Sequence, residues 1–111
     1  MKGDHIGEFE EFVLLAAHGL GLEAYGAAIQ ALLERETTRT VTIGAVYAAL
    51  DRLEQKGLLR SETVPGTAVR GGRSRRVFEL TARGARTIST LRHIRARLYA
   101  GVIPKPARSR T

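Results

Sequence analysis

The order of hydrophobic periods along the 111-residue chain is the feature that most restricts its fold. Three segments with apolar residues at helical spacing come first, followed by two short segments of alternating polar and apolar residues and by one more helical segment. Residues 65–74, which contain proline and glycine, separate the two alternating segments and predict a turn between antiparallel strands. The sequence therefore predicts a mainly α fold with a small β-hairpin (α+β).

The first helix is expected over residues 6–20. Its middle, residues 12–17, is apolar nearly all round, so we expect it to pack against more than one neighbour. A second helix is expected over residues 24–36. After the third helix, period-two alternation predicts strands over residues 59–64 and 76–80. The predicted elements follow the order of a winged helix-turn-helix, which is three helices, two strands joined by a turn, and a further helix.

Capping residues mark the ends of the third and last helices. The hydroxyl of Thr42 can cap the third helix, and Gly57 stands where a helix C-terminus favours glycine. Thr81 can cap a last helix over residues 82–99. The residues of the third helix that we expect to face the core are Ile43, Val46, Leu50 and Leu53.

This pattern divides the chain into three parts. We expect a winged helix-turn-helix domain over residues 1–81 and a C-terminal dimerisation helix over residues 82–100. Residues 101–111 lose all periodicity and are expected to form a basic tail without regular structure. Lys105, Arg108 and Arg110 in this tail either add nonspecific attraction for DNA or have no role.

Charge is distributed unevenly along the chain, whose net charge is +7. Residues 1–59 hold 5 Lys/Arg against 9 Asp/Glu, net −4, and residues 60–111 hold 13 against 2, net +11. Such asymmetry favours one face adapted to a polyanion, although a solvated charged surface is the alternative.

Composition argues against catalysis, metal binding and membrane insertion. The chain has no cysteine, and His5, His18 and His93 have neither metal-ligand nor triad spacing. We therefore expect no enzyme activity, metal or cofactor. The longest apolar stretch, residues 12–17, is too short to span a bilayer, and the N-terminus lacks the pattern of a signal peptide. We expect a cytoplasmic protein.

Two clusters are candidates for contact with double-stranded DNA. Small residues on the outer face of the third helix would let its backbone approach base edges, unless they are small because they pack against another helix. In the turn and second strand, four arginines within seven residues can hold phosphates, unless they are simply solvated. The candidate DNA-binding residues are Thr42, Gly44, Ala45, Tyr47, Ala48, Arg52, Arg70, Arg73, Arg75 and Arg76.

Four segments resemble the PadR family of bacterial transcriptional regulators. They are GEFEEFVLLAAHGL at residues 7–20, Tyr25-Gly26, the pattern GAVYxxLxxLExxGL at residues 44–58, and GGRSRRVFELTARG at residues 71–84. The resemblance extends over residues 7–99. It implies a homodimeric repressor that reads a palindromic operator, with the last helix packed on the partner's first helix. The expected interface residues are Phe9, Phe12, Val13, Ile88, Leu91, Ile94 and Leu98.

The resemblance also places Tyr47 on the DNA-contacting surface, with a structural tyrosine as the alternative. Some relatives bind flat aromatic drugs between tryptophans, but this chain has no tryptophan, so such a site is not expected. A small-molecule effector of unknown identity stays open, with His93 and Tyr99 as candidates to line its pocket. The alternatives are a winged-helix module that grips an acidic protein partner and a regulator of the MarR type.

Overall fold

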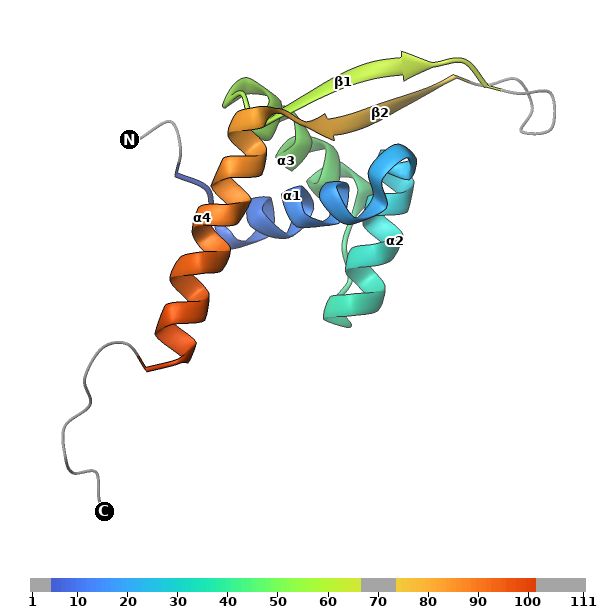
Figure 1. Cartoon of the computed structure of the whole chain (residues 1–111). Coiled ribbons are helices and arrows are strands. Elements are labelled where there is room, and N and C mark those ends of the chain that lie inside the picture. The colour runs from blue at the N-terminus through green and yellow to red at the C-terminus, as the bar shows by residue number, and fades with distance from the viewer. Residues whose placement is uncertain (1–4, 67–73, 102–111) are drawn as a thin grey trace.

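The computed structural model describes residues 5–66 and 74–101, which form four α-helices, one 3-10 helix and a two-stranded hairpin (Figure 1). This architecture confirms the α+β winged-helix prediction. The elements in chain order are α1 (Glu8–Leu20), η2 (Gly21–Glu23), α2 (Gly26–Thr37), α3 (Ile43–Gln55), β1 (Leu59–Val64), β2 (Arg75–Leu80) and α4 (Ala82–Tyr99).

Helix α1 lies at the centre of the domain and contacts α2, α3, β2 and α4. Its side chains Val13, Leu14, Ala16 and Ala17 are buried in one core with Ile29, Leu50, Leu53 and Phe78. This confirms the expectation that the apolar middle of the first helix packs against several neighbours. The apolar character of α1 is therefore largely explained by contacts within the chain itself.

A short extended segment before α2 joins the hairpin. Strands β1 and β2 pair antiparallel, and Tyr25 forms an isolated bridge with Val77. The Phe78 amide donates to the Ala24 carbonyl at 2.8 Å. The prediction that the second helix begins at residue 24 is therefore wrong by two residues, because residues 24 and 25 pair with β2 and leave the helix to begin at Gly26.

The predicted caps of α3 and α4 are confirmed. The Thr42 hydroxyl accepts from the Ala45 amide at 3.1 Å. The Thr81 hydroxyl accepts from the Gly84 amide at 3.0 Å and donates to the Gly57 carbonyl at 2.6 Å. Gly57 has φ +77°, as its place after α3 requires. The end of α3 and the start of α4 are thus joined directly.

One core prediction on α3 is wrong. Val46, Leu50 and Leu53 are fully buried, but Ile43 is 39% exposed. Ile43 occupies the first position of the helix, directly after its cap, where no neighbouring element covers it. The first predicted helix also begins later than expected, at Glu8, although Ile6 still packs against the core.

Helix α4 begins on the domain and then leaves it (Figure 1). Its buried residues are Gly84 and Ile88, and every residue from 92 to 101 is exposed. None of the helices in the described ranges is long and apolar enough to cross a membrane. Most of the predicted tail, residues 102–111, lies outside the described residues.

Candidate nucleic-acid interface

The outer face of α3 carries small side chains that no other element of the described ranges covers. Gly44, Ala45 and Ala48 are exposed, whereas Ala49 on the opposite face is fully buried. A Cβ placed on Gly44 would meet no atom within 4 Å. The first three residues are therefore not small because they pack against another helix, and the backbone of α3 is open to a large partner along this face.

Tyr47 connects two of the motifs noted in the sequence. A Cβ on Gly26 would lie 2.5 Å from the Tyr47 ring, so the ring packs directly on the backbone of α2. Tyr47 nevertheless remains 38% exposed. Its ring thus fixes α3 against α2 while part of it faces solvent, and glycine at position 26 is required because no other side chain leaves room for the ring.

Arg52 points toward α1. Its guanidinium bonds the carboxylate of Glu10 at 2.5 Å, and Lys56, which directly follows α3, bonds the same carboxylate at 2.8 Å. Burial alone would raise the pKa of Glu10, but the bonds from Lys56 and Arg52 outweigh it and lower that pKa. The Arg52 side chain is still half exposed, so part of it stays within reach of a ligand.

The two described arginines of the hairpin contact the domain. The guanidinium of Arg75 lies 3.8 Å from the centre of the Tyr25 ring. Arg76 bonds Glu54 at 2.6 Å and lies 3.6 Å from Asp51, both on α3. These contacts hold the hairpin beside the outer face of α3. Arg70 and Arg73 lie outside the described residues.

The expected dimer residues fall into separate groups. Val13 is fully buried and Ile88 is 6% exposed, so both belong to the core of their own chain. Ile94 and Leu98 on α4 are 46% and 53% exposed. Leu91 lines a hollow between α4 and α1 together with Leu15, an exposed residue that the sequence analysis did not single out.

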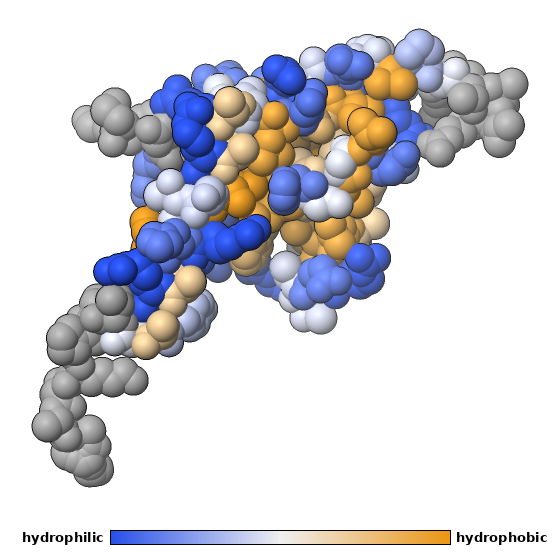
Figure 2. All heavy atoms as spheres, in the orientation of Figure 1, coloured by the Kyte–Doolittle hydropathy of each residue, from blue (hydrophilic) through white to orange (hydrophobic). Residues whose placement is uncertain are grey.

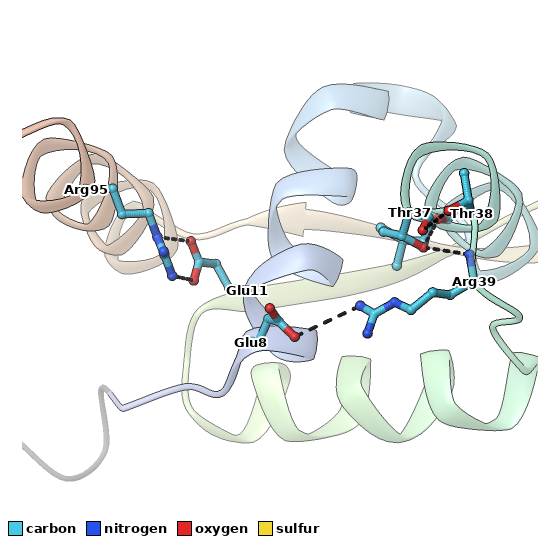
Figure 3. Close-up of polar contacts among 7 residues, drawn as sticks. Glu8, Glu11, Thr37, Thr38, Arg39 and Arg95 are labelled. Carbon is cyan, nitrogen blue, oxygen red and sulfur yellow. Dashed lines mark hydrogen bonds and ion pairs between the residues drawn. The ribbon is translucent and has the colours of Figure 1, made fainter. Parts of the chain in front are cut away.

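Phe9 and Phe12 lie elsewhere, in a hollow beside the turn between α2 and α3 that Leu33 and Val41 also line. The guanidinium of Arg39 lies 5.9 Å from the centre of the Phe12 ring. It also lies 4.0 Å from the carboxylate of Glu8 (Figure 3). The structure therefore does not bring these two phenylalanines together with Leu91, Ile94 and Leu98 on one surface.

Two acidic residues of α1 have a structural role that the sequence analysis missed. Glu10 and Glu11 are each 8% exposed, and Glu11 forms a bidentate pair with Arg95 of α4 at 2.6 and 3.0 Å (Figure 3). The hydrogen bond to Glu11 raises the pKa of Arg95. A helix that is apolar nearly all round leaves little solvent-facing surface for three acids, which is the signal that could have revealed these pairs.

Metal ions are bound in proteins by groups of ligating side chains. The described residues contain no group of three or more His, Asp or Glu side chains that could hold a metal ion. Hydrophobic residues gather over the hollow between α1 and the hairpin (Figure 2), which Leu22, Val77 and Leu80 line.

Comparison with solved structures supports the same fold. A PadR-like transcription factor from Bacteroides fragilis is 29% identical, with a TM-score of 0.67 over 85% of each chain. A PadR family regulator from Eggerthella lenta is 28% identical, with a TM-score of 0.61 over 81% of this chain and 76% of that one. A PadR family regulator from Clostridium difficile is 27% identical, with a TM-score of 0.59 over 84% of this chain and 93% of that one.

Sequence comparison gives the family directly. No curated protein matches the chain. The model of the transcriptional regulator PadR-like family matches residues 15–90, which run from the middle of α1 into α4 and include all of α3 and the hairpin. On this match and on the shared winged-helix fold, the chain belongs to the PadR-like family of transcriptional regulators.

Proposed function

We propose that this PadR-like regulator binds a palindromic operator in double-stranded DNA as a homodimer and represses transcription there. The observation that carries the proposal is the uncovered face of α3, where Gly44, Ala45 and Ala48 are exposed beside the arginines of the hairpin. A helix with such a face can enter a major groove closely, and hairpin cations can neutralise the flanking phosphates.

The charge distribution supports the same mode of binding. Residues from 60 onward carry a net charge of +11, and this part of the chain holds all of the hairpin except Leu59. Arg75 and Arg76 are held on the domain by Tyr25 and Glu54, so they need little further ordering when phosphates replace solvent around them. Thr42, at the N-terminus of α3, adds a hydroxyl and the positive end of the helix dipole.

Homodimerisation is supported by the apolar side chains along the projecting part of α4. Ile94 and Leu98 are exposed one turn apart, and Leu15 and Leu91 border the same side. Because a two-fold dimer presents two copies of α3, it reads two half-sites about 34 Å apart, one turn of DNA. The bound dimer would exclude the polymerase, and an effector that shifts the two copies would release the operator.

The first test is fluorescence-anisotropy binding to a duplex of the protein's own promoter region and to a scrambled duplex. Salt is varied from about 50 to 200 mM, where several phosphate contacts change affinity by orders of magnitude. Tighter promoter binding, with two chains per half-site pair, is the expected result. Equal, weak and salt-insensitive binding to both duplexes would instead favour a module for an acidic protein partner.

A matched pair of variants tests the α3 face. Ala48→Glu places a carboxylate on this face and should weaken operator binding about 10- to 100-fold. Ala31→Glu makes the same change at an exposed position of α2, outside the α3 face and the hairpin, and should alter binding far less. Circular dichroism should give the same helix content for both. Equal losses for the two variants would contradict the assignment of α3 as the DNA-reading helix.

A further inference from the structure

Among the described residues, helix α4 is attached to the domain through its first two turns, where Ile88 joins the core, and through an ion pair further along. At its first turn, Thr81 bonds the Gly57 carbonyl, and Gly84 packs so closely that a Cβ there would lie 2.1 Å from the Leu58 carbonyl oxygen. Further along, Arg95 bonds both carboxylate oxygens of Glu11 on α1 (Figure 3). In the described part of the chain, these two are the only side-chain hydrogen bonds that α4 makes beyond Ile88.

The Glu11–Arg95 ion pair is a contact that can fix the direction of α4. No residue of α4 beyond Ile88 is buried, so packing alone does not fix the angle at which the helix leaves the domain. Glu11 is 8% exposed and belongs to α1, the central helix of the domain. The packing of α1 in the core therefore fixes the position of Glu11 relative to the domain. A guanidinium bound to it through two parallel hydrogen bonds is held in orientation as well as in distance.

We propose that the Glu11–Arg95 pair sets the angle of α4 and thereby the half-site separation that the dimer reads, which makes both residues positioning residues for operator selection. This inference rests on the proposed function. An 18-residue helix is about 27 Å long, so a change of about 10° at its base moves its end by about 5 Å. That displacement exceeds one base-pair step of about 3.4 Å.

Glu10 provides a matched control because it differs from Glu11 mainly in its partner. It is equally buried and also bonds cations, but those cations are Arg52 of α3 and Lys56, which directly follows α3. Helix α3 is already positioned by fully buried Val46, Leu50 and Leu53. Removing the charge of Glu10 should therefore affect affinity for all half-site separations alike, whereas removing that of Glu11 should change which separations bind.

The test is selection from a random 40-base-pair duplex library, followed by sequencing, with the full-length wild type and the variants E11Q, R95Q and E10Q. The wild type should enrich a palindrome with one half-site separation. E11Q and R95Q should enrich the same half-site, but with a wider range of separations between its two copies. The enrichment of the wild-type separation over separations one base pair longer or shorter should fall about fivefold or more. E10Q should keep the wild-type separation.

Two further variants guard against a trivial loss of folding. R92Q removes a charge from an α4 arginine that has no ion pair in the described residues, and it should keep the wild-type separation. The exchange E11R/R95E restores an opposite-charge pair. The range of half-site separations that this variant selects should therefore be narrow again. An E11Q protein that selects the wild-type separation as sharply as the wild type overturns the inference. A wild type that enriches no palindrome refutes the proposed function instead.

Discussion

Helix α3 and the second half of α4 are both partly exposed helices, but they are held in place by different means. One face of α3 is fully buried through Val46, Ala49, Leu50 and Leu53. Beyond Ile88, α4 buries no residue and bonds the domain through Arg95 alone among the described residues. A helix positioned by a core has one place, whereas a helix positioned by its base and one ion pair can change its angle.

This difference suits a regulator that reads two half-sites. The surface proposed to enter the groove must be rigid, because base contacts depend on precise placement. The connection between two such surfaces must be adjustable if an effector is to release the DNA. The buried face of α3 makes its surface rigid. The small number of contacts that α4 makes beyond Ile88 in the described residues would make the connection adjustable.

The largest effect is expected when one side chain is truncated on each of the two helices and the free energies of unfolding are compared. Leu50→Ala should lower the free energy of unfolding by about 2–5 kcal/mol, because it leaves a cavity in the core. Leu98→Ala removes a half-exposed side chain and should change the stability of an isolated chain by about 0.5 kcal/mol or less. Urea unfolding followed by circular dichroism measures both.

Protein concentration sharpens this test. If a second copy covers Leu98, the loss for Leu98→Ala should grow with protein concentration, because association stabilises the folded dimer. The loss for Leu50→Ala should be present at every concentration. A large loss for Leu98→Ala that does not depend on concentration would mean that Leu98 is fixed within its own chain, which contradicts the comparison.

The next effect concerns the base of α4. Gly84→Ala should lower the free energy of unfolding by about 1–3 kcal/mol, because its Cβ would collide with the Leu58 carbonyl, a backbone group that cannot rotate away. Gly44→Ala is the control, since nothing lies within 4 Å of that Cβ and the helix should gain up to about 1 kcal/mol. Thermal unfolding of both variants distinguishes a tight base from an ordinary helix start.

A smaller effect compares the two caps. Thr81→Ala should cost about 1–2 kcal/mol and more than Thr42→Ala, because Thr81 also donates to the Gly57 carbonyl, whereas Thr42 only accepts from Ala45. Thr81→Ser keeps the hydroxyl and should recover most of the loss. Equal losses for the two alanine variants in urea unfolding would show that the link between α3 and α4 adds nothing to the cap.

The features that the sequence predicted well are those that depend on near neighbours in the chain. The caps are hydroxyls at residues 42 and 81, the end of α3 is marked by glycine at 57, and the strands are marked by alternation around residues 65–74. Each of these features acts on residues close to it in the chain, so local chemistry was enough to predict the element that it marks. The small outer face of α3 also followed from helical spacing. The role of Gly26 did not, because the ring that requires it comes from Tyr47.

The features that the sequence did not predict join residues far apart. The sequence alone does not reveal that Glu10 and Glu11 bind cations that lie 42 and 84 residues further on. Similarly, the family resemblance implies that Val13 lies at a dimer interface, but Val13 is fully buried in the core of its own chain. Periodicity tells how much of a helix is covered and does not tell which element covers it.

The smallest effect uses acid to test the ion pair between α1 and α3. The folded-state pKa of Glu10 lies below 4.5, because the bonds from Lys56 and Arg52 outweigh the effect of burial. A lowered pKa means that this carboxylate stabilises the fold fully above about pH 4.5, and that its contribution is lost as the pH falls through the folded-state value.

Glu10→Gln should therefore be less stable than the wild type by about 1 kcal/mol at neutral pH, and the two stabilities should converge as the pH falls through the lowered pKa of Glu10. Urea unfolding at several pH values measures the difference between them. The loss should be small because the buried face of α3 holds the helix without the ion pair. A loss of several kcal/mol that disappears in acid would mean instead that α3 depends on its ion pair as much as we infer that α4 depends on Arg95.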